Sequence, residues 1–403
     1  MNKERIFLLI LASAMFTHIM DFMIMMPLGP QLMRLFDITP QQFSFLVSSY
    51  TFTAGGSGFL AAFLIDRFDR KDSLLFIYTG FLAGTIACAF APSYHILLLA
   101  RCLSGAFGGI LGALILSIVS DAIPLERRAA GIGIVMASFS AASVFGVPFG
   151  LFLASKFNWQ APFFMLAIIA AGILFLIHYK VPKFSSHLSK GTILEGFMEV
   201  IRNVFGRRNP QRGLLFTSVL MFGHFTIIPF IAPYMVGNVG FTEEELTYIY
   251  LVGGALTIFS SPWVGKMADR HGRLKIFVIF SFLVLVPILV ITHMPPIPLW
   301  QALVVSGLFF ILANGRMVPS TTMVTSVIKP ENRGSFMSAR SSIQQMSSGL
   351  ATLIAGSMIS EKPSEVTEGA KALLGYDNVG WIAVVFSLVA ILLARTLRVE
   401  KGA

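Results

Sequence analysis

Twelve apolar stretches, each long enough to cross a lipid bilayer, divide this sequence and limit the folds it can adopt. A membrane-spanning α-helix needs about 20 consecutive apolar residues, and inside a bilayer every backbone N–H and C=O must find a partner within a helix or a closed barrel. Only 12% of the residues are charged, whereas soluble domains carry about 25%. The sequence therefore predicts an all-α membrane protein with twelve transmembrane helices. The stretches lie roughly at residues 5–31, 43–65, 73–92, 96–119, 130–155, 160–179, 213–236, 246–267, 276–294, 299–321, 335–358 and 378–395.

The start of the chain also has features of a secretory signal peptide. Lys3 and Arg5 precede an apolar run, and Ala12 to Ala14 could form a small-residue cleavage site. The run continues well beyond the core of a signal peptide and reaches the length of a span. We expect it to be retained as the first transmembrane helix.

Positive charges are distributed unevenly among the segments that join the spans. If the N-terminus lies inside, the inner segments hold 23 Lys and Arg residues and the outer loops hold four. Cytoplasmic loops of membrane proteins carry an excess of these residues, so we expect the cytoplasmic (inner) membrane, with both termini in the cytoplasm. The net charge of +10 then faces anionic lipid, and its confinement to short loops argues against a nucleic-acid partner.

A basic segment separates the sixth and seventh spans. It contains GTILEGFMEVIRNVF, in which apolar residues recur at helical spacing. This pattern predicts an amphipathic helix on the cytoplasmic membrane surface, which we expect to be a tether rather than a regulatory site. The expected domains are a six-helix bundle over residues 1–180, this linker over 181–211 and a second six-helix bundle over 212–403.

Two short motifs occur in both halves of the chain. IDRFDRK (Ile65–Lys71) follows the second span and ADRHGRLK (Ala268–Lys275) follows the eighth, with corresponding residues 203 positions apart. PLERRAAG (Pro124–Gly131) after span four is echoed by PENRGSF (Pro330–Phe336) after span ten. Parallel six-span repeats with binding at their interface are typical of secondary transporters. We therefore expect two pseudo-symmetric bundles.

These motifs resemble those of the major facilitator superfamily over essentially the whole chain. They are most similar to its twelve-span drug/proton antiporter branch, which includes arabinose-efflux-permease-like members. The loop sequence Gly-x-x-x-Asp-Arg-x-Gly-Arg-Lys is matched at Asp66, Arg67, Arg70 and Lys71, with Ala62 and Asp69 in place of the glycines. The second copy keeps Gly265, Asp269, Arg270, Gly272 and Arg273, and the arginine and glycine face of span four are matched at Arg101, Gly105 and Gly109. The resemblance implies the major facilitator fold and alternating access.

The loop residues are candidates for a cytoplasmic gate. The resemblance implies that Arg70 pairs with an acid at the end of span four, which here is Asp121. Charge pairs of this kind could hold one face shut and separate when that face opens. The alternative is that the charges only mark topology. The gate candidates are Asp66, Arg67, Arg70, Asp121, Asp269, Arg270 and Arg273.

Glycine and proline mark two spans. In span five, FGVPFG brings together Gly146, Pro148 and Gly150, and proline removes a backbone hydrogen bond and kinks a helix. The match to the Gly-Pro-x-x-Gly-Gly sequence of exporters is loose, so the kink could serve export or packing alone. In span four, glycines at i, i+3, i+4 and i+7 from Gly105 predict close approach of a neighbouring helix.

Asp21 is the only one of the twenty acids that lies deep in a span. An ionised acid at mid-helix costs about 2.5–3.5 kcal/mol on the insertion scale, so it needs a partner or a proton. Arg101 in span four lies at a similar depth, and the resemblance implies that spans one and four are neighbours. His18 shares a helix face with Asp21 and titrates near neutrality. We expect proton coupling at Asp21, Arg101 and His18; the alternative is a static salt bridge.

The second half also carries embedded polar residues. Arg316 and Arg340 lie in spans ten and eleven, and His224 lies in span seven. With Gln344 and Gln345 they are candidates for the substrate cavity, where an excess of arginines over acids suits an anionic or amphiphilic solute. The alternative is that both arginines extend to the cytoplasmic surface.

The sequence excludes several other functions. It contains no Gly-x-x-x-x-Gly-Lys-Ser/Thr loop for ATP and no His-Glu-x-x-His or Gly-x-Ser-x-Gly motif. We therefore expect a transporter rather than an enzyme, with no cofactor or metal. The expected function is proton-coupled efflux of a small organic solute by a monomer in the bilayer, with protons as the second transported species. A facilitator or importer, or a receptor that transports nothing, are the alternatives.

Overall fold

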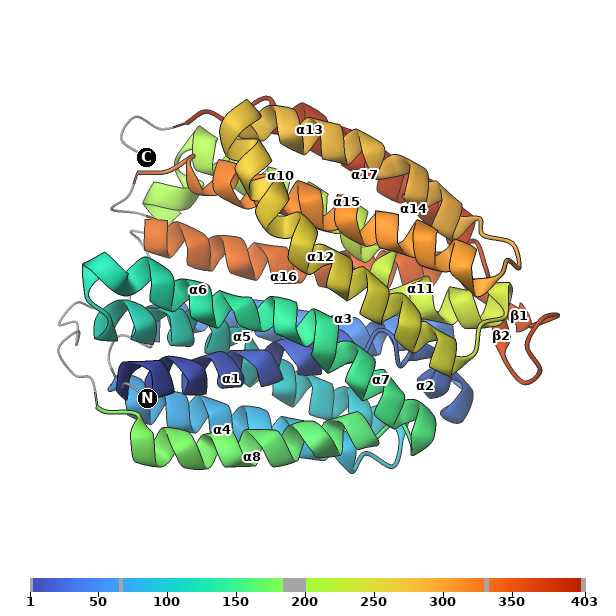
Figure 1. Ribbon diagram of the computed structural model, residues 1–403, viewed down its shortest axis with the longest axis horizontal. Helices are drawn as coiled ribbons and strands as arrows, with labels where there is room; N and C mark the ends of the chain where they lie inside the picture. Colours follow the sequence, from blue (N-terminus) through green and yellow to red (C-terminus); the bar gives the residue numbers. More distant parts are fainter. Residues whose placement is uncertain (1–2, 65–67, 184–200, 330–332, 400–403) are drawn as a thin grey trace. The chain divides into compact units, whose positions relative to one another are not determined.

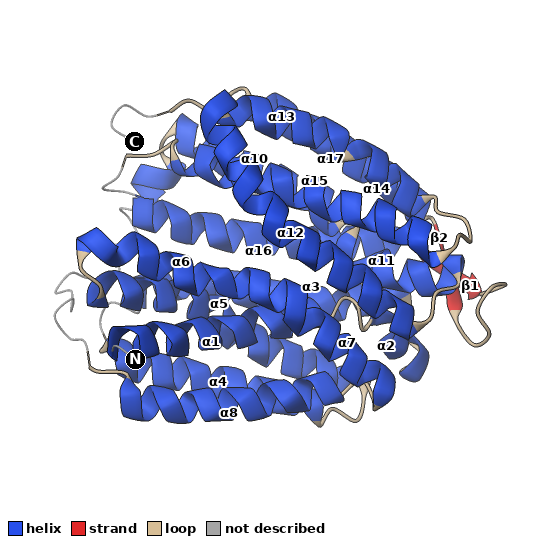
Figure 2. Ribbon diagram, viewed as in Figure 1, coloured by secondary structure: helices blue, strands red, loops and turns tan. Residues whose placement is uncertain are grey.

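The computed structural model describes residues 3–64, 68–183, 201–329 and 333–399, most of which lie in helices (Figures 1 and 2). The chain divides into two compact units, one with residues Met1–Ile24 and Ser49–Glu199 and the other with Met25–Ser48 and Val200–Ala403. The helix α3 (Pro40–Leu64) begins in the second unit and ends in the first.

The elements of the two units follow in chain order. The first unit contains α1 (Lys3–Ile24), part of α3, α4 (Arg70–Ala89), α5 (Tyr94–Ala122), α6 (Leu125–Ala141), the π-helical turn η2 (Ala142–Gly146), α7 (Val147–Lys156) and α8 (Ala161–Lys180). The second contains α2 (Gly29–Leu35), the start of α3, η3 (Ile201–Phe205), α10 (Arg208–Phe225), α11 (Ile228–Tyr234), η4 (Met235–Val239), α12 (Glu243–His271), α13 (Arg273–Leu283), α14 (Leu285–Thr292), α15 (Leu299–Thr325), α16 (Arg333–Met358), β1 (Ser360–Pro363), β2 (Lys371–Leu374) and α17 (Tyr376–Ala394).

Three of the spans are interrupted helices. The pieces α6–η2–α7, α10–α11–η4 and α13–α14 each follow one another directly along the chain and correspond to one apolar stretch. Counted in this way, the described residues supply the twelve spans, and the predicted all-helical membrane architecture is confirmed. Nine of these helices are long and apolar enough to cross a membrane by composition. Of the other three, α3 and α16 are rich in Ser, Gly and Gln, and α12 carries charged residues at both ends.

The first span is shorter than the sequence analysis predicts. The helix α1 ends at Ile24, and the short helix α2 starts at Gly29 after a turn, although the apolar stretch continues to residue 31. Pro27 and Pro30 explain the break, because proline cannot donate a backbone hydrogen bond and disfavours a helical residue before it. Asp21 therefore lies about one turn from the end of α1.

The expected division into domains differs from the compact units at residues 25–48. In the structure α2 packs against α11 of the second unit. A short antiparallel hairpin also belongs to this unit, with Ser360 of β1 opposite Leu374 of β2. The amphipathic linker helix lies mainly within residues 184–200, outside the described part of the chain, and remains a prediction.

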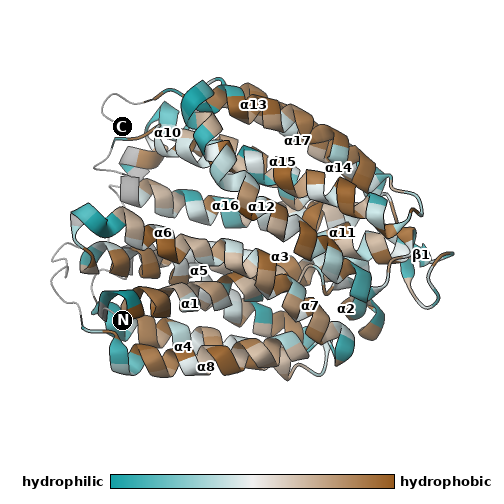
Figure 3. Ribbon diagram, viewed as in Figure 1, coloured by the Kyte–Doolittle hydropathy of each residue, from teal (hydrophilic) through white to brown (hydrophobic). Residues whose placement is uncertain are grey.

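Apolar side chains hold the first unit together. Its core contains residues from α1, α4, α5, α6 and α8, including Leu11, Tyr78, Phe81 and Leu111. Figure 3 shows the same apolar character along α8, α13 and α14, and a hydrophilic turn between α12 and α13. Burying apolar surface contributes roughly 25 cal/mol per Å², so this packing fixes the positions of the polar groups carried by α1 and α5.

Candidate proton and solute site

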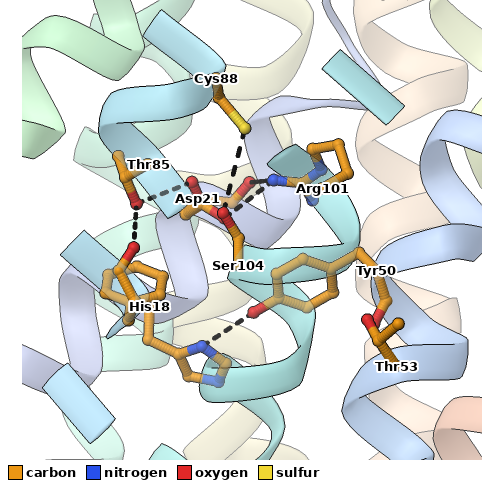
Figure 4. A network of polar contacts seen from close by, with 9 residues as sticks. His18, Asp21, Tyr50, Thr53, Thr85, Cys88, Arg101 and Ser104 are labelled. Atoms are coloured by element: carbon orange, nitrogen blue, oxygen red, sulfur yellow. Dashed lines mark hydrogen bonds and ion pairs between the residues drawn. The ribbon is translucent and has the colours of Figure 1, made fainter. Parts of the chain in front are cut away.

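Asp21 of α1 and Arg101 of α5 form a buried ion pair in the first unit (Figure 4). The guanidinium Nη1 of Arg101 lies 2.8 Å from Oδ2 of Asp21 and also donates to the backbone oxygen of Asp21 at 3.2 Å. Both side chains have no exposed surface. The structure thus brings together the two residues that the sequence analysis matched by depth.

Two further side chains complete this pair. The hydroxyl of Thr85 donates to Oδ1 of Asp21 at 3.4 Å and to the backbone oxygen of Phe81 at 3.1 Å. The Tyr50 ring lies under the guanidinium, whose Cζ is 4.5 Å from the ring centroid; a cation over an aromatic ring is stabilised, more strongly when it is desolvated. Among the residues that the structure describes, the Nε and Nη2 atoms of Arg101 have no hydrogen-bond partner. Arg101 therefore binds Asp21 through Nη1, and the parallel N–H groups of Nε and Nη2 on another edge of the guanidinium remain without an acceptor.

His18 joins this cluster through Tyr50 and not through Asp21. Its Nδ1 lies 2.9 Å from the Tyr50 hydroxyl, and its ring packs edge-on against Phe81. A Cβ atom on Gly108 would overlap with the Tyr50 hydroxyl and would lie 3.0 Å from His18 Nδ1. The glycine face of α5 is thus what allows these two side chains to meet.

Sequence reasoning missed Tyr50 and Thr85. Tyr50 lies in SSYTFT, a short polar segment within an apolar stretch, and that composition was the available signal. Nothing in the sequence around Thr85 distinguishes it from other threonines of the spans. Thr85 could be assigned only once the packing of α4 against α1 had placed it beside Asp21.

The fifth span contains a π-turn two residues before a proline. Between α6 and α7, residues 142–146 form η2, and Pro148 is the second residue of α7. Proline in a helix removes one hydrogen bond, and a π-turn is one of the local arrangements that accommodate it. A Cβ on Gly146 would lie 3.0 Å from the sulfur of Met20, and one on Gly150 would lie 2.8 Å from Cδ1 of Ile24. These glycines let α1, which carries Asp21, pack closely on the interrupted helix.

The gate candidates of the first unit form one well-defined pair. Arg70 Nε lies 2.9 Å from Asp121 Oδ2, and the Arg70 side chain is only 6% exposed. Asp69, which replaces a glycine of the loop motif, accepts from the backbone N–H of Lys71 and Asp72 and caps the start of α4. Asp66 and Arg67 lie outside the described residues, so their roles remain predictions.

The second copy of the loop is more open. Asp269 and Arg273 are 3.9 Å apart, with side chains 73% and 45% exposed, and Arg270 is exposed. Gly272, between α12 and α13, has φ +93, a backbone conformation that favours glycine. The repeated sequence therefore does not produce a repeated ion pair among the described residues.

The candidates of the second unit are buried rather than extended to the surface. Arg316 has no exposed surface and lies nine residues before the end of α15, and Arg340 is 8% exposed. His224 Nδ1 is buried without a partner. Gln344 and Gln345 are partly buried on α16. The alternative in which Arg316 extends to the cytoplasmic surface is excluded by its burial.

Charged groups outside the spans are paired at the hairpin end of the second unit. Lys371 Nζ lies 2.8 Å from both Asp37 Oδ1 and Glu361 Oε1. The hydrogen bond and charge of Lys371 hold the pKa of Asp37 below its usual value, and the bonds to Asp37 and Glu361 raise the pKa of Lys371. Arg34 and Glu243 form another pair at 2.7 Å.

A twelve-span protein of two repeated six-helix halves, with buried charged groups inside the spans, belongs to the class of secondary transporters. Comparison with known proteins identifies the family. The model of the Major Facilitator Superfamily matches residues 11–352 and 213–402, and the chain belongs to this superfamily. The resemblance inferred from the sequence motifs is therefore confirmed.

Individual relatives agree with this assignment. The chain is 24% identical to the uncharacterized MFS-type transporter YceJ of Bacillus subtilis (strain 168), over 85% of this chain and 87% of YceJ. It is 26% identical to a probable sugar efflux transporter of Mannheimia succiniciproducens, over 50% of this chain and 49% of that protein. The crystal structure of a D-xylose–proton symporter shares the fold, with a TM-score of 0.80 and 16% identity over the full length of both chains.

Proposed function

We propose that this transporter exchanges protons for a small organic or amphiphilic solute, in the direction of efflux. The observation that carries the proposal is the ion pair between Asp21 and Arg101, whose side chains are both fully buried. Intramembrane ionisable residues are costly and mark ion or substrate pathways in membrane proteins. In the described spans, a fully buried carboxylate and a fully buried guanidinium meet at this pair.

The geometry supports a simple exchange of partners. With Asp21 ionised, its Oδ2 holds Arg101 Nη1, and with Asp21 protonated the guanidinium loses its anionic partner. Desolvation favours the neutral acid and the adjacent cation favours the carboxylate. Any movement of α5 that separates the two groups therefore favours proton uptake by Asp21, and their return favours release. His18, one turn before Asp21, is a second group that can accept a proton.

The surrounding packing supports such a movement. The backbones of α5 and α3 lie close together at Gly105 and Gly109. A Cβ at either position would overlap with backbone atoms of Tyr50 or Ala54, so the glycines are needed for this packing. Small residues at helix contacts leave few interdigitated side chains. The helix α1, which carries Asp21, packs on the fifth span, the one that η2 interrupts. Asp21 and Arg101 thus lie on helices whose contacts allow a small shift.

The experiment uses proteoliposomes that contain a pH-sensitive dye. Solutes from a fixed panel, including xylose, arabinose, benzoate and ethidium, are added singly, and the internal pH is followed. We expect at least one solute to drive proton movement in the parent and none to do so in Asp21→Asn. Glu368→Gln, which also removes one carboxylate but at an exposed position, should behave like the parent. Proton movement of parental size in Asp21→Asn would overturn the proposal.

The sign of the pH change distinguishes the alternatives. An exchanger moves protons out as solute enters, a symporter moves both in the same direction, and a facilitator moves solute without protons. The probable sugar efflux transporter among the relatives supports efflux, whereas the likeness to the D-xylose–proton symporter concerns the fold alone. Radiolabelled solute uptake in the same vesicles detects the facilitator.

A further inference from the structure

Arg316 of α15 is a fully buried cation with no acidic partner. Its Nη1 donates to Oγ of Ser387 on α17 at 2.9 Å, and that hydroxyl in turn donates to the backbone oxygen of Ala383 at 2.7 Å. Its Nε and Nη2 have no hydrogen-bond partner in the described part of the chain. No carboxylate pairs with Arg316 among the residues that the structure describes.

The unpartnered atoms define a specific shape. Nε and Nη2 carry two parallel N–H groups on one edge of the guanidinium, the edge that takes both oxygens of a carboxylate in a bidentate contact. A buried charge without a partner is strongly unfavourable. Arg101 leaves the same edge open, but its charge is already balanced by Asp21. Among the described residues, Arg316 has neither acceptors for its Nε and Nη2 edge nor an opposite charge beside it.

The helix segments that meet at Ser387 carry a second unpartnered group and aromatic side chains. A Cβ on Gly223 of α10 would lie 3.2 Å from the Ser387 hydroxyl that Arg316 contacts. Its neighbour along the chain is His224, whose Nδ1 is also buried and unpartnered. Phe222, which precedes Gly223 in the sequence, stacks on Phe386 with ring centroids 5.1 Å apart. One cation, one imidazole and two stacked rings thus lie on or next to the segments of α10 and α17 that meet at Ser387.

We propose that Arg316 binds the carboxylate of an organic monoanion, through its Nε and Nη2 edge, with His224 as a further hydrogen-bonding group. This inference rests on the proposed transport function, because a carrier must admit its solute to buried groups. One guanidinium balances one negative charge, which favours a monocarboxylate over a doubly charged phosphate. The stacked rings of Phe222 and Phe386 favour an organic body on that carboxylate over a bare ion.

The experiment measures binding at equilibrium, without a gradient, in the full-length protein in nanodiscs. The thermal midpoint Tm is recorded while sodium benzoate or sodium acetate is titrated, with sodium phosphate and sodium chloride at matched ionic strength. We expect a saturable rise in Tm with benzoate. Loss of a charge-assisted hydrogen bond costs about 1.5–3 kcal/mol, so Arg316→Gln should raise the apparent Kd for benzoate by about ten- to a hundredfold.

Two further variants separate charge from geometry. Arg316→Lys keeps the charge but loses the bidentate edge, and it should bind benzoate more weakly than the parent. Lys266→Gln removes one cation at an exposed position of α12 and should leave the benzoate response unchanged. The proposal is overturned by an unchanged response in Arg316→Gln, by no saturable response to either carboxylate in the parent, or by an equal response to chloride.

The binding result is independent of proton coupling. Benzoate binding that depends on Arg316, together with unimpaired proton exchange in Asp21→Asn, would refute the proposed coupling and retain the carboxylate site. Proton exchange that depends on Asp21, without Arg316-dependent binding, would refute the carboxylate site and retain the coupling.

Discussion

The two halves of the chain each bury an arginine in the fourth helix of the six-helix repeat, and they balance its charge differently. In the first half, Arg101 of α5 meets the carboxylate of Asp21 at 2.8 Å. In the second half, the hydroxyl of Ser387 is the one hydrogen-bond partner of Arg316 of α15 among the described residues. The buried charge of Arg101 is therefore balanced within the first half. Our proposals assign a proton response to this pair and an anion from elsewhere to Arg316, which would give the repeated fold two different chemistries.

The largest expected effect is the difference in the free energy of unfolding between a variant that lacks Arg101 and one that lacks Arg316. Arg101→Ala leaves Asp21 buried without a cation, and removing one partner of a buried pair costs about 3–5 kcal/mol. Arg316→Gln removes a charge that has no partner, so the free energy of unfolding should stay the same or rise. Denaturation of both variants in nanodiscs at neutral pH tests this. Equal destabilisation by both would show that Arg316 has an unrecognised counter-charge, and the contrast between the halves would be wrong.

The next effect concerns the glycine that admits the Tyr50–His18 contact. A methyl group on Gly108 would overlap with the Tyr50 hydroxyl, and overpacking of this kind costs typically about 1–3 kcal/mol. Gly108→Ala should lower Tm and slow solute-driven proton movement. Gly112→Ala is the matched control on the same face, because its nearest atom is the methyl group of Met15 at 3.9 Å. Similar losses of Tm and proton movement in both variants would show that the contact between Tyr50 and His18 has no special role.

An effect of similar size is expected from one of the two copies of the loop motif. Arg70 is nearly buried against Asp121, and a hydrogen bond between charged groups contributes about 1.5–3 kcal/mol. Arg273 and Asp269 are exposed and 3.9 Å apart, an arrangement worth about 0–1 kcal/mol. Arg70→Gln should therefore lower Tm and change the transport rate, and Arg273→Gln should change neither. A reversal of this order would place the cytoplasmic gate in the second half.

The smallest effect concerns the ion pairs of Lys371 outside the spans. Because Lys371 lowers the pKa of Asp37, this pair contributes stability above the usual carboxyl pKa of about 3.9, and the contribution is lost as the pH falls through the lowered pKa. The pKa of Lys371 is raised, so its contribution is complete at neutral pH and is lost only in strong alkali. Lys371→Gln should lower Tm slightly at pH 7 in low salt. The difference from the parent should shrink at pH 3 and in 1 M salt, and a difference that persists there would show that the lysine acts by packing.

The fold followed from the sequence because its main signals are local. Apolar runs of span length, together with loop motifs 203 residues apart, are enough to predict twelve helices in two repeats. The pairing of Asp21 with Arg101 could be predicted because a lone buried acid requires a cation at its own depth. Depth is set by position along a helix, which the sequence does contain.

The missing parts of the site depend on rotation and close packing instead. Tyr50 reaches both Arg101 and His18 because α3 lies directly on the glycine face of α5. That contact is set by how the two helices turn about their axes, which hydropathy does not specify. The early end of α1 at Ile24 was missed for a related reason, since the apolar run continues through two prolines that end the helix but remain hydrophobic.

The π-turn at residues 142–146 also sets the phase of the fifth span. Each residue of an α-helix advances the side chains by 100°, which follows from about 3.6 residues per turn, and a π-turn holds one residue more in the same length of axis. Without it, α7 would be rotated by about a quarter of a revolution relative to α6, and Gly150 would no longer face Ile24. One inserted residue therefore works as a fixed angular offset, which keeps both α6 and α7 in contact with α1.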